Sequence, residues 1–137
     1  MPVRDRTARE VLDDHLRLAE TWAFEIDLQR NFAEDIVLMT TYGTFRGHEG
    51  VRQKVALLAE HLPGGRWTYE RIECENGLGF LEWTAEAEDG ARVEDGADSY
   101  RIEDGKIRAM TIHYTVRGPD GALLAGRGAA ATRGDRE

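Results

Sequence analysis

The chain has 137 residues, with 18 basic and 26 acidic side chains and a formal net charge of −8. This length fits one domain with a substantial core but not two, and the negative charge opposes binding to nucleic acid or to an anionic membrane surface. The single cysteine, Cys74, excludes an intrachain disulfide and is compatible with a reducing compartment. A charged start and the lack of a long apolar run predict a soluble, cytoplasmic protein.

The first half of the chain is predicted to be mainly helical. Thr7 and Glu10 have the spacing of a capping box, and apolar residues at helical intervals after them predict a helix over residues 8–23. A short second helix is expected over residues 26–32. A third is expected over residues 51–62, where valine and leucine recur on one helical face before a Pro-Gly-Gly stop.

His15 falls on the apolar stripe of the first predicted helix, between Val11 and Leu18. One interpretation is a histidine at a helix boundary that is hydrogen-bonded to a neighbour, and the other is a side chain that faces a pocket. The position alone leaves both open, so His15 is a candidate pocket residue.

The second half of the chain is predicted to be rich in strands. The pairs Asn76-Gly77 and Asp104-Gly105 each separate two β-rich runs, which is the pattern of a two-residue hairpin. Two antiparallel hairpins are therefore expected, after an earlier strand that lies between the second and third helices. The expected strands cover residues 36–41, 67–75, 78–88, 96–103 and 106–116.

The first of these hairpins has a register that can be checked for consistency. Regular pairing around its turn places Arg71 opposite Glu82 on a wet face and puts Leu81 and Trp83 on an inner face. The same register places Glu70 opposite Trp83. Either Glu70 lines a pocket there, or it is exposed at the end of its strand.

In the second hairpin, regular pairing places Asp98 opposite Thr111. Asp98 then shares a mostly apolar face with Tyr100, Thr111 and His113, because side chains alternate between the two faces of a strand. A carboxylate on such a face needs a partner or a function. His113 lies diagonally opposite, about 7 to 8 Å away between backbones, which allows direct or water-bridged coupling.

The other face of this hairpin ends in Met110, Ile112 and Tyr114. An apolar patch on an outer face predicts coverage by another surface, and a homodimer formed through the outer sheet face would provide it. The rival explanation is a β-bulge near Met110. A bulge would reverse the alternation, put these three residues in the pocket and take His113 out of it.

The order of elements indicates an α+β fold in which about three N-terminal helices pack on a curved, mostly antiparallel sheet and enclose an apolar pocket. Residues 1–6 are expected to form an N-terminal arm and residues 7–116 the domain. Residues 117–137 are rich in glycine, alanine and charge without periodicity, which predicts a flexible tail.

Four segments resemble a SnoaL-like member of the nuclear-transport-factor-2-like superfamily, over about residues 7–116. They are residues 31–37 (Asn-Phe-Ala-Glu-Asp-Ile-Val), 45–52 (Phe-Arg-Gly-His-Glu-Gly-Val-Arg), 81–85 (Leu-Glu-Trp-Thr-Ala) and 96–107 (Gly-Ala-Asp-Ser-Tyr-Arg-Ile-Glu-Asp-Gly-Lys-Ile). The resemblance implies a cone-shaped domain with an apolar cavity, usually homodimeric. The family includes polyketide cyclases, ketosteroid isomerases, dehydratases and epoxide hydrolases, and also members without catalysis, so the fold alone names no reaction.

The family's site residues carry over only in part. Asp98 matches the position of the general base in SnoaL-type cyclases and of the protonated oxyanion-hole aspartate in ketosteroid isomerases. The isomerase base would fall at Thr40 and its tyrosine at Leu16, so steroid isomerase activity of the known kind is disfavoured. The histidine of the cyclases would fall near Thr84 and is missing.

These observations predict a cofactor-independent acid/base enzyme of cyclase, isomerase or dehydratase type that acts on a small apolar carbonyl compound. Asp98 is the expected base and His113 the expected acid or orienting group. No metal is expected, because the four histidines lack ligand spacing. A non-catalytic, ligand-binding dimer is the alternative, with Asp98 and His113 as satisfied structural residues. The expected lining residues are Tyr100, Trp83, Thr111, His15, Leu81 and Glu70.

Overall fold

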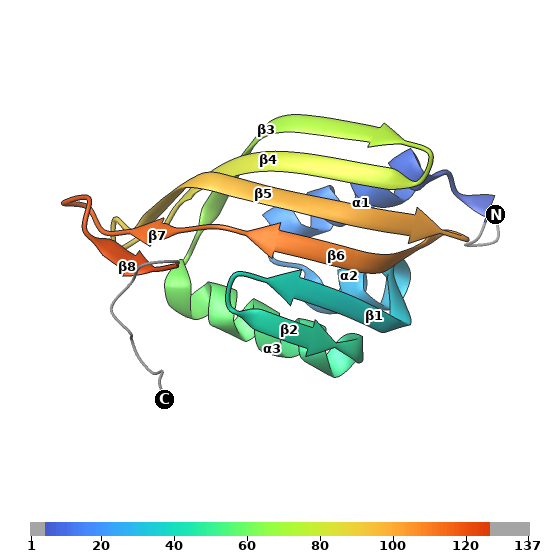
Figure 1. Ribbon diagram of the computed structural model, residues 1–137, viewed down its shortest axis with the longest axis horizontal. Helices are drawn as coiled ribbons and strands as arrows, with labels where there is room; N and C mark the ends of the chain where they lie inside the picture. The colour runs from blue at the N-terminus through green and yellow to red at the C-terminus, as the bar shows by residue number, and fades with distance from the viewer. Residues whose placement is uncertain (1–4, 127–137) are drawn as a thin grey trace.

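The computed structural model describes residues 5–126. Its helices are α1 (Ala8–Glu20), α2 (Phe24–Asn31) and α3 (Gly47–His61), and they lie together on one side of a sheet (Figure 1). The strands are β1 (Phe32–Thr40), β2 (Gly43–Arg46), β3 (Arg66–Glu75), β4 (Leu78–Glu86), β5 (Arg92–Glu103), β6 (Lys106–His113), β7 (Val116–Arg117) and β8 (Leu123–Ala125).

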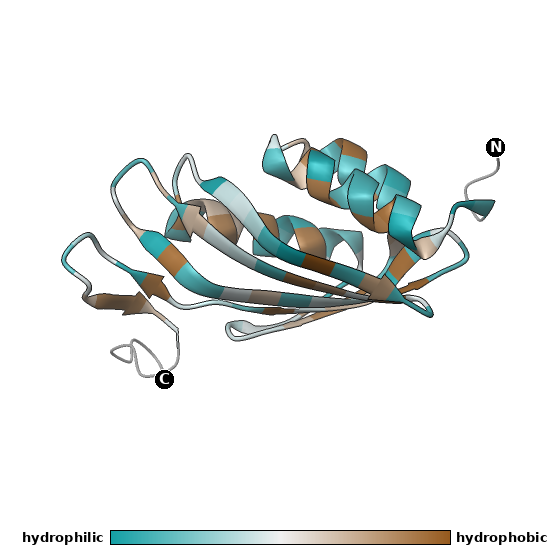
Figure 2. Cartoon of the chain, turned by 90° about the horizontal axis from the view of Figure 1, so that it is seen from above, coloured by the Kyte–Doolittle hydropathy of each residue, from teal (hydrophilic) through white to brown (hydrophobic). Residues whose placement is uncertain are grey.

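The main path of the sheet runs β2-β1-β6-β5-β4-β3, and β7 and β8 extend it beside β5. All pairings are antiparallel except β1 with β6, which is parallel. The sheet is strongly curved and the helices lie on its concave side (Figure 2). This arrangement confirms the predicted α+β cone with helices on a curved, mostly antiparallel sheet.

Helix α1 begins where the capping box predicts. The Glu10 amide donates to Thr7 Oγ1 at 3.1 Å, and the Thr7 amide donates to Glu10 Oε1 at 2.8 Å, which satisfies two free amides of the first turn. The helix ends at Glu20, three residues before the expected end. Trp22 adopts a positive φ of 59°, which ends the helical path, and its indole donates to the Gly65 carbonyl at 2.9 Å.

Several other boundaries also differ from the predictions, and those of β1 and α3 are set by contacts with other elements. Strand β1 begins at Phe32, four residues before the expected start, and its pairing with β6 is irregular between Phe32 and Val37. Helix α3 begins at Gly47 instead of residue 51. In its first turn, His48 Nε2 lies 3.0 Å from the Phe32 carbonyl oxygen, so a tertiary contact fixes the start of this helix.

Both predicted hairpin turns are present. Asn76 and Gly77 have φ values of 53° and 77°, and Asp104 and Gly105 have 54° and 74°. Two successive positive φ values define the turn that matches the twist of a two-residue hairpin, and asparagine, aspartate and glycine tolerate them best.

The second hairpin contains a β-bulge that the regular register does not predict. Ile102 pairs with Ile107, but Arg101 pairs with Ala109, so Arg108 has no partner on β5. Beyond this point the alternation is reversed, and Asp98 lies opposite Ile112 instead of Thr111. The regular register is therefore wrong here, and the rival explanation of a bulge is confirmed two residues from its expected place.

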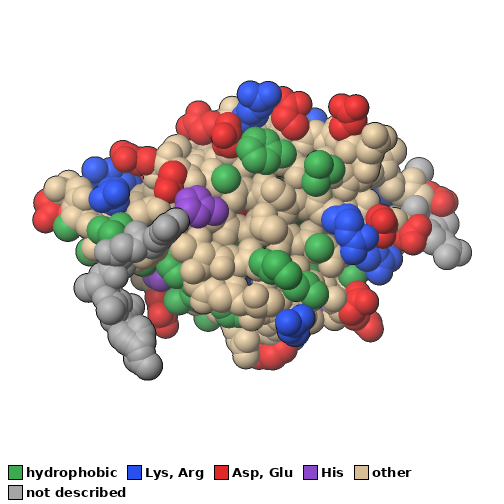
Figure 3. All heavy atoms as spheres, in the orientation of Figure 1, with side chains coloured by type: hydrophobic (Ala, Val, Ile, Leu, Met, Phe, Trp, Pro, Cys, Tyr) green, Lys and Arg blue, Asp and Glu red, His purple; other side chains and the backbone are tan. Residues whose placement is uncertain are grey.

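The reversal moves the patch that was expected to form a dimer surface. Met110 and Tyr114 are buried on the concave side with 7% and 0% exposure, and Ile112 faces the same interior. These residues cannot provide an outer interface, because the fold itself covers them. Figure 3 shows the outer face of the sheet, where hydrophobic side chains are scattered and charged ones lie mainly toward the edges. The homodimer stays a prediction without these residues.

The region that was expected to be a flexible tail starts with a short hairpin. Val116 in β7 is buried, and β7 pairs with both β5 and β8. The Arg92 guanidinium donates to the Gly118 carbonyl at 2.9 Å, which ties the hairpin to β5. Residues 127–137 of the predicted tail, and 1–4 of the predicted arm, lie outside the described residues.

None of the helices within residues 5–126 is both long and apolar enough to cross a membrane.

Candidate active site

Two small neighbouring cavities lie between the concave face of the sheet and the helices. Their volumes are about 70 Å³ and about 60 Å³. Lys54, Leu58 and Ile112 line both, so these side chains separate the two spaces. The first cavity is also lined by Leu16, Ala19, Trp67, Tyr69, Leu81 and Trp83, and the second by His15, Phe24, Asp27, Phe32, Leu38, Val51, Val55 and Met110.

Asp98 lies in β5 between two residues that line the first cavity, Leu81 on β4 and Ile112 on β6. It is 7% exposed. The Trp83 indole donates to its Oδ1 at 2.9 Å, and the Tyr100 hydroxyl donates to its Oδ2 at 3.1 Å. Burial raises the pKa of this carboxyl to about 6, and the two hydrogen bonds oppose the rise because they stabilise the charged form. Asp98 thus titrates close to neutral pH.

His15 extends from α1 toward this carboxyl. Its Nδ1 lies 2.7 Å from Asp27 Oδ2, and its Nε2 lies 3.4 Å from the Tyr100 hydroxyl. Burial disfavours the imidazolium, but the charges of Asp27, Asp98 and Asp14 outweigh it, so the pKa of His15 is raised. A protonated His15 donates to Asp27 from one nitrogen and points the other at Tyr100, whose hydroxyl donates to Asp98.

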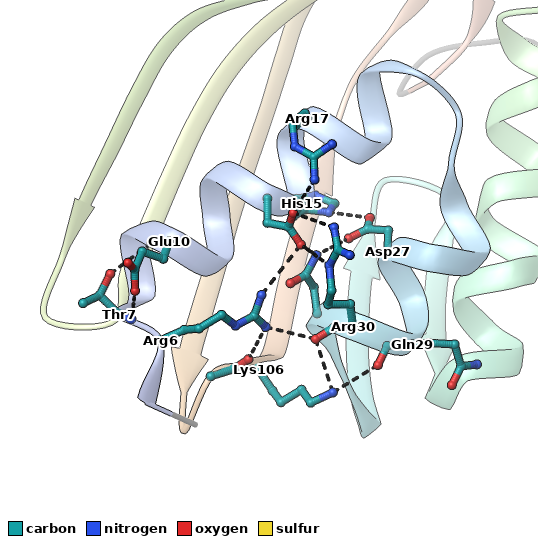
Figure 4. Close-up of polar contacts among 12 residues, drawn as sticks. Arg6, Thr7, Glu10, His15, Arg17, Asp27, Gln29, Arg30 and Lys106 are labelled. Atoms are coloured by element: carbon teal, nitrogen blue, oxygen red, sulfur yellow. Dashed lines mark hydrogen bonds and ion pairs between the residues drawn. The ribbon is translucent and has the colours of Figure 1, made fainter. Parts of the chain in front are cut away.

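Asp27 connects the buried group of His15, Tyr100 and Asp98 to the surface of the protein. Asn31 donates from its Nδ2 to Asp27 Oδ1 and to Asp14 Oδ2, both at 2.9 Å. Asp14 is held by the guanidinium groups of Arg30 at 2.8 Å and Arg17 at 2.7 Å (Figure 4). These contacts, with that of Arg30 the largest, keep the pKa of Asp14 well below its usual range. The polar chain fixes α1 and α2 in position around the site.

Lys54 brings a second basic group into the interior from α3. It is 3% exposed, and its Nζ donates to the Tyr114 hydroxyl at 3.2 Å and lies 4.7 Å from the centre of that ring. The same hydroxyl lies 2.7 Å from His61 Nδ1. Burial lowers the pKa of Lys54 to about 8, and the charge of Asp98 opposes this shift.

Three of the expected pocket-lining residues line the two cavities. Trp83 and Leu81 line the first cavity and His15 lines the second. Tyr100 is buried on the concave side and hydrogen-bonds Asp98, but it lines neither cavity. His15 combines features of both interpretations, because it lines a cavity and is also hydrogen-bonded to its neighbour Asp27.

His113 lies on the opposite face of the sheet from Asp98. The bulge turns His113 and Thr111 to the outer face of the sheet, where both are exposed. His113 Nε2 lies 3.4 Å from Asp95 Oδ2, and its Nδ1 lies 3.2 Å from Thr41 Oγ1. The expected pairing of Asp98 with His113, and the expected place of Thr111 in the pocket, are therefore corrected.

Glu70 is also outside the pocket. Tyr69 pairs with Trp83 and Arg71 with Glu82, so Glu70 is the extra residue of a bulge in β3. Its carboxylate is exposed and accepts from Thr84 Oγ1 at 3.1 Å. Tyr69 takes the inner place instead, and its hydroxyl donates to the Leu16 carbonyl at 2.7 Å.

Sequence reasoning missed Asp27 and Lys54, and it placed Tyr114 in the pocket only under the rival explanation of a β-bulge. Lys54 had a usable signal, because it lies three residues after Val51 on the apolar stripe of α3, where a lysine is unusual. Tyr114 faces the interior only because of the bulge in β6. Asp27 had no signal beyond its place in a short helix with a weak apolar pattern.

Two wider openings lie elsewhere on the surface. A groove of about 470 Å³ crosses the ends of β3, β4 and β5, and its buried lining residues, Ala85 and Val93, are apolar. A hollow of about 270 Å³ lies between α2 and α3. Within residues 5–126, no three His, Cys, Asp or Glu side chains are grouped to hold a metal ion. The buried titratable groups gather at the two small cavities.

The SnoaL-like domain family matches residues 16–110 of the sequence. Because this match covers more than half of the chain, the protein belongs to the SnoaL-like family. A comparison with curated proteins finds no match.

Solved structures with the same fold share little sequence with this chain. One, from Mesorhizobium loti and named as a candidate SnoaL-like polyketide cyclase, has a TM-score of 0.63 and 22% identity over 80% of this chain and 100% of that one. An NTF2-like protein of unknown function from Cytophaga hutchinsonii has a TM-score of 0.62 and 16% identity, covering 79% and 89%. A candidate isomerase of the SnoaL-like family from Agrobacterium tumefaciens has a TM-score of 0.59 and 16% identity, covering 73% and 96%.

Proposed function

We propose that the protein is a cofactor-independent acid/base enzyme that moves a proton next to the carbonyl group of a small apolar compound. This is the chemistry of a cyclase, isomerase or dehydratase. The observation that carries the proposal is the state of Asp98, a buried carboxyl behind the cavity wall whose pKa is raised to about 6. A base whose pKa lies near the working pH can both take and return a proton.

In this proposal, the Asp98 carboxylate takes a proton from the carbon beside the carbonyl, and negative charge develops on the carbonyl oxygen. Cationic groups near Asp98 can stabilise that charge in an interior with little water. Lys54 and a protonated His15 are the two such groups whose charges lower the pKa of Asp98. The Tyr100 hydroxyl, which bonds Asp98, holds the carboxyl in one orientation.

The size and lining of the cavities support a small, apolar substrate. Drug-sized ligands occupy sites of about 300–1,000 Å³, and these cavities are about 70 Å³ and about 60 Å³. Their walls are mainly aliphatic and aromatic, and Trp83 and Tyr69 offer flat surfaces to an unsaturated compound. The related structures named as a cyclase and an isomerase support a reaction of this class.

The test is exchange of α-protons for deuterium, followed by NMR on a panel of small ketones and aldehydes in D₂O. Asp98→Asn keeps the shape of the side chain and removes the base, so exchange should fall by about 10²- to 10⁴-fold. Asp95→Asn is the matched control, because Asp95 lies on the same strand, is exposed and contacts His113 instead of the cavity. An exchange rate that is the same in wild type and Asp98→Asn would refute the role of Asp98.

One observation favours the alternative of a non-catalytic domain that binds small molecules. Both oxygens of Asp98 already have a protein donor, and the lining of the cavities is formed by its neighbours. A purely structural carboxyl would look the same. In that case none of the carbonyl probes exchanges faster with the wild-type protein than with buffer, and Asp98→Asn binds them as tightly as wild type.

A further inference from the structure

Lys54 lies where the two cavities meet, and its amine has few partners. The residue lines both cavities and is 3% exposed. Among residues 5–126 no carboxylate lies within 4.0 Å of its Nζ, and the one hydrogen bond described for it goes to Tyr114. A buried lysine without a close counterion is costly to keep charged, so its amine is a candidate for chemistry.

The Tyr114 hydroxyl offers a route by which this amine can lose its proton. It lies between Lys54 Nζ at 3.2 Å and His61 Nδ1 at 2.7 Å. Burial, and then the charge of Lys54, lower the pKa of His61 to about 4, so His61 is neutral and its Nδ1 can accept from the hydroxyl. His61 is the last residue of α3 and is half-buried, which places the end of this hydrogen-bonded path near solvent.

The surroundings also favour a population of neutral amine. With a pKa of about 8, about one Lys54 side chain in ten is uncharged at pH 7. Burial sets this balance, and the charge of Asp98 opposes it. Tyr114 lies beside the amine and bonds His61, and the other titratable groups that line the two cavities are His15, Asp27 and Tyr69. An uncharged lysine amine in an apolar pocket is a nucleophile for carbonyl carbon.

We propose that Lys54 is a nucleophile that forms a Schiff base with a small aldehyde or ketone bound in these cavities. The geometry that supports it is a buried amine, shared by both cavity walls, whose hydrogen-bond partner leads to a half-buried histidine. The proposal rests on the carbonyl chemistry of the proposed function, but it does not require that Asp98 be the base.

The step balances without an added reagent. The nitrogen lone pair of the neutral amine forms a C–N bond, the C=O π pair moves to oxygen, and one proton passes from nitrogen to that oxygen to give a carbinolamine. Its C–O bond then breaks, water leaves with a second proton from nitrogen, and a C=N bond remains. One amine and one carbonyl compound give one imine and one water.

The imine explains why an amine and a carboxyl lie together. Asp98 in its acid form can give one proton to the imine nitrogen, which makes the iminium ion, and its carboxylate then takes a proton from the neighbouring carbon. The electron pair of that C–H bond moves toward the positive nitrogen and forms an enamine. The charge of Asp98 raises the pKa of Lys54, and the charge of Lys54 lowers the pKa of Asp98. The two groups therefore interact electrostatically.

The sequence makes the test simple, because Lys54 and Lys106 are the two lysines of the chain. The full-length protein is treated at pH 7 with propanal and sodium cyanoborohydride, which reduces a C=N bond to a stable secondary amine, and the propylated residue is located by peptide mass spectrometry. We expect Lys54 to be labelled about tenfold faster than Lys106, with a rate that saturates as the propanal concentration rises. Lys106 contacts backbone carbonyls at the surface and is the internal control.

Variants separate this proposal from the role of Asp98. Lys106→Arg should keep the fast label, and Lys54→Arg should remove it. If Lys54→Arg does not fold by circular dichroism, Lys54→Met removes the amine with a side chain of similar length, and the comparison of the two lysines in the wild type needs no variant. Labelling of Lys54 no faster than Lys106 overturns the Schiff base, whereas exchange that survives Asp98→Asn overturns only the assigned base.

Discussion

Burial and hydrogen bonding shift the pKa of the Asp98 carboxyl in opposite directions. Burial alone favours the protonated acid, and the donors Trp83 and Tyr100 favour the carboxylate. The result is a group with a pKa of about 6 instead of 3.8. Above that pH the fold keeps a charge in its interior, which disfavours the folded state, so the residue that we propose for catalysis should also limit stability.

The first consequence is a stability effect that depends on pH. Asp98→Asn should raise the free energy of unfolding at pH 8, because asparagine carries no charge to bury. Between the unfolded pKa near 4 and the folded pKa of about 6, the folded protein holds the extra proton, so stability falls as the pH rises. The gain should be about 1–3 kcal/mol at pH 8 and should disappear near pH 4. Urea unfolding at pH 4, 6 and 8 measures it.

Asp95→Asn is the control with the opposite sign. Burial raises the pKa of Asp95, but its hydrogen bonds with Thr115 and its contact with His113 outweigh this effect and lower the pKa. Its carboxylate therefore stabilises the fold above the unfolded pKa, and that contribution is lost as the pH falls through the folded pKa. Asp95→Asn should lose stability at pH 8 and not at low pH. If both variants responded alike, the two carboxyls would not differ as described.

At the scale of the strands, two β-bulges decide which side chains face the cavities. In β6, the unpaired Arg108 reverses the alternation, so that Met110, Ile112 and Tyr114 face inward. A lost pair in the ladder costs about 1 kcal/mol, whereas each large apolar side chain that becomes buried contributes about 1.5–3 kcal/mol. Burial therefore outweighs regular pairing, and His113 is left on the outer face.

Deletion of Arg108 tests this account directly. Without the extra residue, Ile107 and Ala109 become neighbours opposite Ile102 and Arg101, so regular pairing keeps Met110 opposite Tyr100 and leaves the three apolar side chains inside. The deletion variant should therefore fold, and its free energy of unfolding, like that of Arg108→Ala, should change by less than about 1 kcal/mol. Deletion of the regularly paired Thr111 is the control, because it turns at least one of the three apolar side chains outward and should destabilise the fold more. Urea unfolding followed by circular dichroism compares the variants, and an Arg108 deletion that is less stable than the Thr111 deletion would contradict the account.

At the scale of the whole molecule, the site exists only because distant segments meet on the concave face. His15 and Tyr100, which lie 3.4 Å apart, are separated by 85 positions in the sequence. Lys54 and Tyr114 are separated by 60. The three helices and strands β1, β3, β4 and β6 each supply part of the cavity walls, and Ile112 lines both spaces.

Ile112→Ala should join the two cavities into one larger apolar space. We expect a loss of about 2 kcal/mol in the free energy of unfolding, toward the low end for removal of a core isoleucine, because the side chain already borders empty space. The enlarged space should bind benzene, as dry apolar cavities do, and benzene should raise the melting temperature of this variant more than that of wild type. Thr111→Ala, on the outer face, should show neither effect. Equal responses to benzene would contradict a dividing role for Ile112.

The sequence by itself determined what depends on local chemistry. The capping box, the apolar stripes of α1 and α3 and the two positive-φ turns act over a few residues, so their positions could be predicted. The inner face was predicted correctly for Tyr100, Trp83, Leu81 and Asp98. Each of them lies between its hairpin turn and the nearest irregularity of its own strand, so the alternation counted from the turn still holds.

Only the tertiary structure decided which polar groups share the interior. The bulges at Glu70 and Arg108 arise because buried area at distant positions outweighs one lost pairing. The apolar residues Met110, Ile112 and Tyr114 indicated that a bulge in β6 was possible, but the sequence pattern could not decide between a bulge and a dimer surface.

The bulge at Arg108 turns His113 to the outer face and Tyr114 inward, where its hydroxyl contacts Lys54. His15 reaches Tyr100, which hydrogen-bonds Asp98, because α1 packs on the sheet. The expected pair of Asp98 and His113 is therefore replaced by Asp98, His15 and Lys54 from three different elements.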